Sequence, residues 1–496
     1  MLEEYLHKYF QFNTFRLGQK EVITSVLNGH HTMAMLPTGT GKSLCYQLSG
    51  YLMDGQVIIV SPLLSLMQDQ VEQMKMNGEK RVAAINSFLT GHERKRVMKN
   101  LDQYKFIWIS PESLANDQII LALKKLNLSL FVIDEAHCIS QWGYDFRPDY
   151  LRLGEVRGKL GNPLTLSLTA TATKEVVDDI IQSLLLENCQ QYLFSVDRPN
   201  IALAVEQTNS SQEKLNLLYD YAVKFQGPGI IYFSSKKMSE QAADFLHSKG
   251  ISRVTAYHGG MDQESRILIQ QQFLYDQLDI ICATSAFGMG INKENIRFVI
   301  HFHMPQQIES YLQEIGRAGR DGKPSIALLL YSPGDEQIAY GLAESEIPSS
   351  VQLDWLESAI KNMDLDWFNH PESQEELKKI GGFSDIQWRL LRDHFFHQQD
   401  GHNGIHDLHQ FKQELEKRKN HKRRKVAFMT SWCQTTACRR QQILDYFQEQ
   451  ERESKIENCC DICGIHLSSY HRNQNQKDSL DDLCWKHRLA KLLLKK

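Results

Sequence analysis

The stretch MLPTGTGKS, residues 35–43, is rich in glycine and threonine and ends on a lysine and a serine. It follows the short apolar run TMAM and precedes a helical pattern, the setting in which a backbone loop surrounds phosphates at a helix N-terminus. In such a loop the Lys42 amine reaches the terminal phosphates and the Ser43 hydroxyl binds Mg²⁺. Leu36 stands where the strict pattern has glycine, and a glycine-rich turn with an incidental lysine is the alternative. The predicted nucleotide-binding residues are Thr38, Gly39, Thr40, Gly41, Lys42 and Ser43.

A second motif, DEAH at residues 134–137, follows the apolar run LFVI. A carboxylate at the end of a strand completes a Mg²⁺ coordination shell, and a second carboxylate polarises an attacking water. We therefore expect Asp134 to bind the metal and Glu135 to act as the base in ATP hydrolysis. A lone acidic pair is commonly a solvated strand end, so this prediction depends on the combination with Lys42.

A third motif, QEIGRAGRD at residues 313–321, places Arg317 and Arg320 three residues apart, on one face of a helical turn. Guanidinium groups suit the charge that develops on a transferring phosphoryl group. An isolated arginine pair is more often part of a solvated helix face. The apolar runs around this pair indicate a second α/β unit. We therefore expect the two arginines to complete an ATP site when a cleft between two units closes, and hydrolysis to reopen it.

The three motifs lie among apolar, β-rich runs that alternate with helical patterns. In the first part of the chain the runs are VIIVSP, FIWIS, LFVIDEAH and LTLSLTATAT. The alternation starts again near residue 206 with GIIYFSS, DIICATS, RFVIHF and SIALLLYS, and 195–209 is the expected connection. From Asp335 onward charged helical patterns replace the strand runs. This alternation predicts an α/β fold of two tandem doubly wound parallel sheets with ligands at the carboxyl ends of the strands, followed by a helical module.

Ten cysteines in a chain whose beginning lacks a secretion signal indicate reduced thiols rather than a disulfide framework. Four of them are grouped after the helical patterns, and four thiolates suffice for a structural zinc site. Neighbouring side chains tend to point apart, so the adjacent pair in this group is awkward as joint ligands, and His466 or Cys433 are alternatives. Free buried cysteines are the alternative without a metal. The predicted zinc ligands are Cys438, Cys459, Cys460 and Cys463.

The composition, 42% hydrophobic and 23% charged, is that of an ordinary soluble protein. No apolar stretch reaches the ~18 residues of a membrane span, so we expect no membrane partner and a cytoplasmic location. The net charge of −4 means that any positive surface for nucleic acid must be local. The run KRKNHKRRK, residues 417–425, holds seven cations and no acid. It is either a solvated helix face or a phosphate-contacting surface.

In their order along the chain these motifs resemble those of superfamily 2 helicases, and specifically the RecQ family. The resemblance covers roughly residues 1–465, and the run after DEAH is specific to this family. The length and ending of the chain resemble the short bacterial form. The matching stretches are FRLGQKEVI (15–23), LPTGTGKSLCYQ (36–47), SPLLSLMQDQ (61–70), SPES (110–113), DEAHCISQWGYDFRPDY (134–150), LTATAT (168–173), ATSAFGMGINKENIRFVIH (283–301) and QEIGRAGRDG (313–322).

The resemblance implies a domain organisation. We expect RecA-like domains over residues 1–205 and 206–340, a helical zinc-binding module over 341–466, and a basic tail over 467–496. The family's zinc-binding module starts with a helix similar to CRR at residues 438–440, which supports the zinc prediction.

The resemblance also implies roles for residues outside the three motifs. Phe12, Arg16 and Gln19 match the family motif that recognises adenine, and a glutamine can form paired hydrogen bonds with that base. Thr169 and Thr171 fall in the motif that couples hydrolysis to movement along DNA.

Trp142, Phe146 and Arg147 match the family's aromatic-rich loop, which binds single-stranded DNA and signals its presence to the ATPase. Stacking of an aromatic ring on a base contributes ~1–3 kcal/mol and tolerates any sequence. A single tryptophan is usually part of a core, but glycine, proline and charged neighbours favour a loop here. Tyr144 replaces the histidine that the family uses in ATP–DNA coupling, so we expect that coupling to differ. Asn292 replaces the usual aspartate, and we expect activity to survive both changes.

We therefore expect an ATP-dependent DNA helicase or translocase that moves 3′ to 5′ and serves recombination and repair at the nucleoid. Its expected cofactors are ATP, Mg²⁺ and Zn²⁺. Its expected partners are single-stranded and tailed duplex DNA, with single-stranded-DNA-binding or recombination proteins as further partners, and the expected state is a monomer. Too few residues follow His466 for the winged helix of longer family members, which puts strand separation rather than translocation in question.

Two alternatives to this function remain open. The first is an RNA helicase of the DEAD/DEAH type, against which the loop WGYDFR argues. The second is a DNA-binding ATPase that switches conformation without unwinding.

Overall fold

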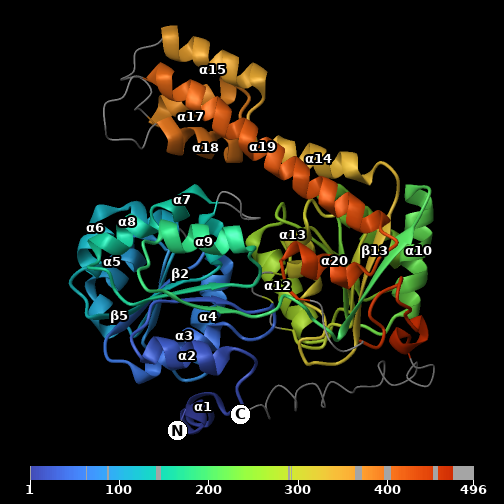
Figure 1. Ribbon diagram of the computed structural model, residues 1–496, viewed down its shortest axis with the longest axis horizontal. Coiled ribbons are helices and arrows are strands. Elements are labelled where there is room, and N and C mark those ends of the chain that lie inside the picture. Colours follow the sequence, from blue (N-terminus) through green and yellow to red (C-terminus); the bar gives the residue numbers. More distant parts are fainter. Residues whose placement is uncertain are drawn as a thin grey trace. The chain divides into compact units, whose positions relative to one another are not determined.

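The structure is a computed structural model that describes residues 2–62, 64–86, 89–140, 147–288, 291, 293–362, 371–395, 404–450 and 456–472. The chain divides into two compact units, and each contains one parallel sheet (Figure 1). The first unit comprises Met1–Arg198, Met304–Gly316 and Gly334–Glu453, and the second comprises Pro199–His303, Arg317–Pro333 and Ser454–Lys496.

The sheet of the first unit has seven strands in the order β3-β4-β2-β5-β6-β1-β7, and every pairing is parallel. This arrangement confirms the predicted parallel sheet. The short or polar strands β3 and β7 are additions to the four apolar runs and TMAM. The strands are β1 Thr32–Met35, β2 Gln56–Val60, β3 Val82–Ile85, β4 Phe106–Ile109, β5 Leu128–Ile133, β6 Thr165–Thr169 and β7 Gln190–Leu193.

Helices cover both faces of this sheet, so the central strands are buried on both sides (Figure 1). Alternate residues such as Val57 and Ile59 of β2 pack with the helices α1 to α4, whereas Ile58 and Val60 belong to the opposite face. The helices are α1 Leu2–Phe10, α2 Gln19–Leu27, α3 Ser43–Leu52, α4 Leu64–Met76, α5 Gly91–Lys99, α6 Asp117–Leu123, α7 Pro148–Leu151, α8 Leu153–Lys159 and α9 Lys174–Ser183.

The sheet of the second unit has six strands in the order β10-β11-β9-β12-β13-β8, again all parallel. The helices α10 Ser211–Lys224 and α11 Lys236–Ser248 pack on one face, and α12 Gln263–Leu274 contacts β10. The strands are β8 Ile201–Gln207, β9 Gly229–Tyr232, β10 Val254–Tyr257, β11 Ile280–Ala283, β12 Phe298–His301 and β13 Ser325–Tyr331.

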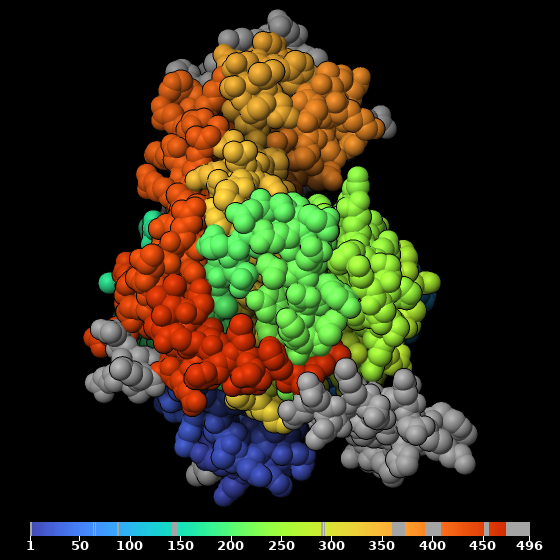
Figure 2. Space-filling view, turned by 90° about the vertical axis from the view of Figure 1, so that its right-hand side faces the viewer, coloured from blue at the N-terminus to red at the C-terminus, as the bar shows by residue number. Residues whose placement is uncertain are grey.

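The connection expected over residues 195–209 contains the strand β8. Its alternating small and aliphatic residues pair with β13 over seven positions, so tertiary pairing rather than a strong local pattern makes it a strand. The expected domain boundary after residue 205 therefore falls inside β8. The segment 456–472 also belongs to this unit and borders its green helices in Figure 2, with bridges from Cys460 to Leu203 and from His471 to Phe225.

Helices dominate the described residues between 335 and 446, as the sequence predicts. The helices α15, α17, α18 and the first part of α19 enclose a core of their own, which includes Trp388 and Phe411 (Figure 1). The helix α13 belongs to the first unit and contacts α19. The helices are α13 Ile308–Ile315, α14 Asp335–Ser345, α15 Ser350–Asn362, α17 Pro371–Ile380, α18 Asp385–Phe395, α19 Gly404–Gln434 and α20 Arg439–Tyr446.

Candidate active site

The predicted phosphate-binding loop connects the end of β1 to the start of α3. Gly39 and Gly41 have φ angles of 86° and 78°, in the left-handed region that favours glycine. The Thr40 hydroxyl donates to the carbonyl of Pro37 at 2.7 Å, which closes the turn at the start of the loop. Since Ser43 is the first residue of α3, the loop ends at a helix N-terminus, where backbone N–H groups attract anions. The residues present therefore fit a nucleotide phosphate group.

Gln19 is a structural support of this loop. Its side chain is buried, and its Nε2 donates to the carbonyls of Thr40 at 2.7 Å and Gly41 at 3.1 Å. Its Oε1 accepts a hydrogen bond from the backbone N–H of Arg16 at 2.9 Å, while Arg16 Nη1 donates to the Gly39 carbonyl at 2.7 Å. Both polar residues of the predicted adenine motif thus hold the backbone of the phosphate loop.

Phe12, the third residue of that motif, makes none of these contacts in common with the other two, and the residue is 54% exposed. An exposed ring retains a free face for stacking on a planar group. We infer that adenine stacking on Phe12 is compatible with this structure. Paired hydrogen bonds from Gln19 to adenine would instead require its Nε2 to leave the loop carbonyls.

Asp134 and Glu135 directly follow β5, at the carboxyl end of the sheet. The Asp134 N–H donates to the Val60 carbonyl at 2.9 Å, and the Glu135 N–H donates to Asp134 Oδ1 at 3.0 Å. Burial, followed by the Glu135 carboxylate, raises the pKa of Asp134 to about 7, although Lys42 acts in the opposite direction. A buried carboxylate with a raised pKa beside a second carboxylate is stabilised by a bound cation, so this donor set fits Mg²⁺.

His137 is a site residue that the sequence analysis did not select, although it is the last letter of DEAH. Its Nδ1 lies 2.9 Å from the Thr169 hydroxyl oxygen and 3.5 Å from Glu135 Oε2. Burial, aided by the charges of Lys42 and other cations, holds the pKa of His137 well below its usual value, so the ring is neutral. The neutral ring thus lies beside both the predicted base and the first threonine of the predicted coupling motif.

The structure describes one of the three predicted DNA-binding residues. Arg147 donates from Nη1 to the Pro62 carbonyl at 2.8 Å, and its backbone N–H donates to the Cys138 carbonyl at 3.0 Å. Its guanidinium thus contacts the chain that follows β2. Trp142, Phe146 and Tyr144 lie outside the described residues.

Arg317 and Arg320 belong to the second unit, and both point to one short segment of it. Arg317 Nη1 donates to the Gly288 carbonyl in a close contact, and Arg320 Nη1 donates to the Ile291 carbonyl at 2.6 Å. Gly288 has a φ angle of 123°, and a side chain there would collide with the Arg317 guanidinium. The shared segment agrees with the expectation that the two arginines lie on one side of their turn. Asn292 lies outside the described residues.

The four grouped cysteines come together: their sulfur atoms all lie within 4.8 Å of one another. Tetrahedral Zn²⁺ with ~2.3 Å bonds to thiolates has sulfur atoms roughly 3.8 Å apart, a spacing that this cluster allows, so the donor set fits zinc. The expected awkwardness of adjacent Cys459 and Cys460 was wrong. Both sulfur atoms belong to the group of four although the residues are adjacent in the chain. Cys433 is buried in α19 and is not one of the four.

The basic run 417–425 lies on α19, and part of its charge is neutralised within the protein. A solvated helix face and a phosphate-contacting surface both stay predictions for this run. Three cations form ion pairs with acids, Lys422 with Glu346, Arg423 with Glu344 and Lys425 with Glu309.

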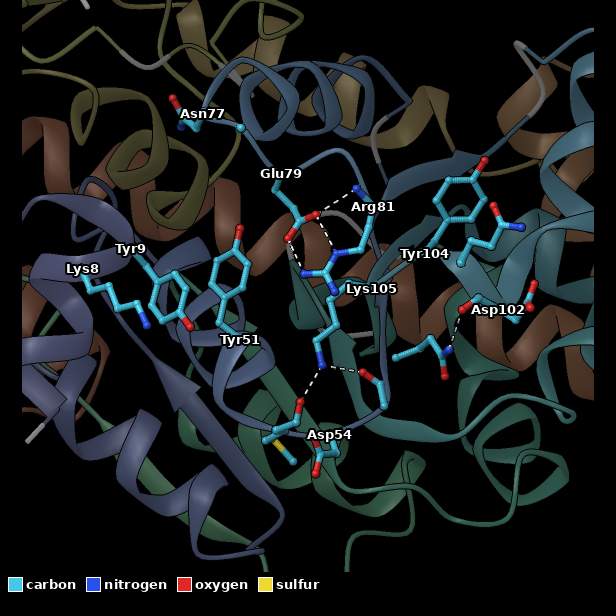
Figure 3. Close-up of a pocket in the computed structure, with 15 residues that line it drawn as sticks. Lys8, Tyr9, Tyr51, Asp54, Asn77, Glu79, Arg81, Asp102, Tyr104 and Lys105 are labelled. Atoms are coloured by element: carbon cyan, nitrogen blue, oxygen red, sulfur yellow. Dashed lines mark hydrogen bonds and ion pairs between the residues drawn. The ribbon is translucent and has the colours of Figure 1, made fainter.

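A polar hollow of about 600 Å³ lies at the amino-terminal ends of strands in the first sheet, opposite the ends that carry the phosphate loop (Figure 3). It is lined by residues that precede β2, β3 and β4, at the amino ends of these strands, whereas the phosphate loop follows β1 at its carboxyl end. Figure 3 shows Lys105 bound to two backbone carbonyls, Arg81 paired with Glu79, and the rings of Tyr9 and Tyr51 stacked at 4.7 Å. No predicted site residue lines the hollow, which is separate from the nucleotide site.

Comparison with known families identifies the domains of the chain. Residues 16–180 match the DEAD/DEAH box helicase family, residues 213–322 the helicase conserved C-terminal domain, and residues 394–464 the RecQ zinc-binding domain. The chain is 45% identical to the probable ATP-dependent DNA helicase RecS of Bacillus subtilis, over 95% of this chain and 93% of RecS. The chain belongs to the RecQ family. The resemblance seen in the sequence is thereby confirmed.

Among RecQ proteins the chain has the short RecS form. It is also 42% identical to the ATP-dependent DNA helicase RecQ of Haemophilus influenzae, over 66% of this chain but only 53% of that protein. The match to RecS covers nearly all of both chains and therefore includes the zinc-binding region and the helices before that region. The match to the longer RecQ protein covers only about half of that protein.

Solved structures of other helicases share the fold of this chain. Lhr of Mycobacterium smegmatis, bound to single-stranded DNA and AMP-PNP, has a TM-score of 0.56 at 18% identity, over 79% of this chain and 56% of Lhr. The DEAD-box helicase Mss116, bound to single-stranded RNA and UDP-BeF, has a TM-score of 0.57 at 16% identity, over 87% of this chain and 88% of Mss116. At these identities the likeness concerns the fold alone. Among the described helices, none has the length and apolar character to span a membrane.

Proposed function

We propose that this RecQ-family protein is an ATP-dependent DNA helicase that moves 3′ to 5′ on single-stranded DNA and opens tailed duplexes. One observation carries the proposal: a phosphate loop and a half-buried Asp134–Glu135 pair lie at the carboxyl end of one sheet, in a chain that matches RecS over nearly its whole length. The direction and a role in recombination and repair follow from the resemblance to the family.

In the proposed reaction the phosphate loop binds the triphosphate and Lys42 neutralises its terminal groups. Ser43 and Asp134 would hold Mg²⁺, which supplies charge neutralisation between the outer phosphates. Glu135 accepts a proton from the attacking water. Arg317 and Arg320 are proposed to stabilise the charge that develops on the transferred group, as guanidinium ions do in related reactions.

The proposed DNA side of the motor begins a few residues after DEAH. Trp142 and Phe146 stack on bases, and Arg147 approaches the phosphate backbone, which gives affinity without sequence preference. His137 contacts Thr169 and lies near Glu135. These contacts support a path by which DNA binding at the aromatic-rich loop affects Glu135. The grouped cysteines are proposed to bind one structural Zn²⁺ that stabilises the segment around α20.

Strand displacement on duplexes with a 3′ or a 5′ single-stranded tail tests this function. We expect ATP-dependent opening of the 3′-tailed substrate by the wild-type protein and none by Lys42→Ala. Opening of the 5′-tailed substrate alone would reverse the proposed direction. DNA-stimulated hydrolysis without opening of either substrate would favour the ATPase switch, and preferential opening of RNA duplexes would favour an RNA helicase.

A further inference from the structure

Arg198 lies at the end of the first unit and contacts the phosphate-binding loop. Its Nη1 donates to the Thr38 carbonyl at 2.7 Å and to the Gly316 carbonyl at 3.2 Å. Thr38 belongs to the loop that we propose to bind ATP. Gly316 ends α13 and is followed directly in the chain by Arg317, so one guanidinium joins the loop to the residue next to a proposed catalytic arginine.

The approach of Gly316 to Thr38 is close enough to require glycine. A Cβ atom at position 316 would collide with the Thr38 hydroxyl and with the Leu312 carbonyl. The backbone of the loop and the end of α13 are therefore in contact, and Arg198 lies where it can hold both carbonyls at once. A charged donor makes stronger hydrogen bonds to carbonyls than a neutral one.

The backbone that carries Arg198 is fixed by α20 and the residues just after it. Arg440, in the first turn of α20, donates from Nη1 to the Asp197 carboxylate in a close contact and to the Arg198 carbonyl at 3.2 Å. The side chains of Asp197 and Arg440 are 4% and 6% exposed, so solvent screens this ion pair little. Glu449 accepts a hydrogen bond from the Val196 N–H at 2.9 Å.

We propose that Arg198 is a positioning residue for ATP hydrolysis and that the Asp197–Arg440 pair holds it in place. Arg198 aligns the phosphate loop with the end of α13, and α20, which begins after Cys438, sets the position of Arg198. This role rests on the proposed ATPase function and adds a residue to it that lies outside the nucleotide-binding motifs. The zinc-binding region thereby acts on hydrolysis through residues 196–198 rather than through a contact with nucleotide.

The alignment has a specific kinetic consequence. ADP binding requires the phosphate loop alone, whereas hydrolysis also requires the proposed arginine after Gly316 to be aligned with the loop. We expect Arg198→Ala to lower kcat of ATP hydrolysis by about tenfold or more, because small misplacements of reacting groups are costly. The Kd for ADP should stay within about threefold of the wild-type value, since the loop itself is held by Gln19 and Arg16.

A double-mutant cycle tests the link from Arg198 to α20. Arg440→Gln should lower kcat in the same direction, and the double variant Arg198→Ala/Arg440→Gln should be no slower than Arg198→Ala, because both act through one contact. Arg198→Lys keeps the charge but lacks the planar fork, and should recover part of kcat. The matched control is Arg81→Ala, which removes an arginine at the amino-terminal end of β3, away from the phosphate loop. This variant should leave kcat unchanged.

The outcomes separate this inference from the proposed function. A kcat of Arg198→Ala within about threefold of wild type, or a double variant whose loss is the product of the two single losses, would overturn the positioning role. A parallel loss of ADP affinity would do so as well, since it would mean that Arg198 only shapes the loop. Absence of ATPase activity in the wild-type protein would instead refute the proposed function. Unfolding curves show which variants fold. If Arg198→Ala does not fold, the kcat and the ADP affinity of Arg198→Lys are compared with those of the wild-type protein instead.

Discussion

The raised pKa of Asp134 makes the affinity for Mg²⁺ depend on pH in the neutral range. The metal binds the carboxylate and not the carboxylic acid, so protons and Mg²⁺ compete for this group. With a pKa of about 7 in the protein free of nucleotide, Asp134 is ionised in about nine of ten molecules at pH 8 and in about one of eleven at pH 6. The apparent affinity for Mg²⁺ should therefore fall about tenfold from pH 8 to pH 6 and change little above pH 8.

The assay is a Mg²⁺ titration of the binding of a fluorescent ATP analogue at pH 6, 7 and 8, at constant ionic strength. Glu135→Gln removes the neighbouring carboxylate that raises the pKa of Asp134, so its profile should move to lower pH. Asp134→Asn should bind the analogue with a Mg²⁺ dependence that is weak at every pH. A Mg²⁺ midpoint that is the same at pH 6 and pH 8, or a Glu135→Gln profile equal to that of wild type, would refute the reasoning.

Three further predictions concern other parts of the site. Gln19→Ala removes two hydrogen bonds to the phosphate loop, each worth ~0.5–1.5 kcal/mol, so the measured affinities for ATP and GTP should fall together by roughly tenfold; loss of ATP affinity alone would show that Gln19 reads adenine. Thr169→Val removes the hydrogen bond to His137 and preserves shape, so basal hydrolysis should persist while stimulation by DNA falls, and equal losses of both would contradict the coupling. Cys438→Ser should lose bound zinc by atomic absorption and melt at lower temperature, whereas Cys189→Ser should keep its zinc; retention of zinc in Cys438→Ser would exclude this ligand.

The apolar, β-rich runs predicted the central strands of both sheets because these strands are buried on both faces and are hydrophobic throughout. The strands that the pattern missed have other characters. β7, QQYL, is an edge strand with exposed side chains, and β8 is rich in alanine and is defined by its pairing with β13. Their existence depends on neighbouring strands rather than on local sequence.

Local sequence motifs predicted those parts of the nucleotide site that lie within a single short stretch of the chain. The loop 36–43 is one uninterrupted stretch of sequence, and so is the acidic pair after β5. The geometry of the loop follows from a strand end and a helix start, and that of the pair from a strand end. The contact of His137 with Thr169 depends on β5 and β6 being neighbours, which needs the strand order and not only the existence of both strands. The link from Arg198 to Thr38 spans 160 positions and has no sequence signal at all.

The charged helix α19 shows what a run of like charges leaves undetermined. Seven cations in nine residues read as a candidate nucleic-acid surface, but the acids that neutralise several of them come from α13, α14 and the residue after α14. Pairing partners that lie 76 or more positions away cannot be inferred from a run of like charges.

The central claim is that hydrolysis of ATP at the phosphate loop is coupled to single-stranded DNA. The most direct measurement is the steady-state ATPase rate of the wild-type protein with increasing single-stranded DNA, single-stranded RNA of the same sequence, or neither. We expect DNA to raise kcat strongly, RNA to have little effect, and Lys42→Ala to show no hydrolysis under any condition. Stimulation by RNA equal to or greater than that by DNA, or a rate that no nucleic acid changes, would contradict the account.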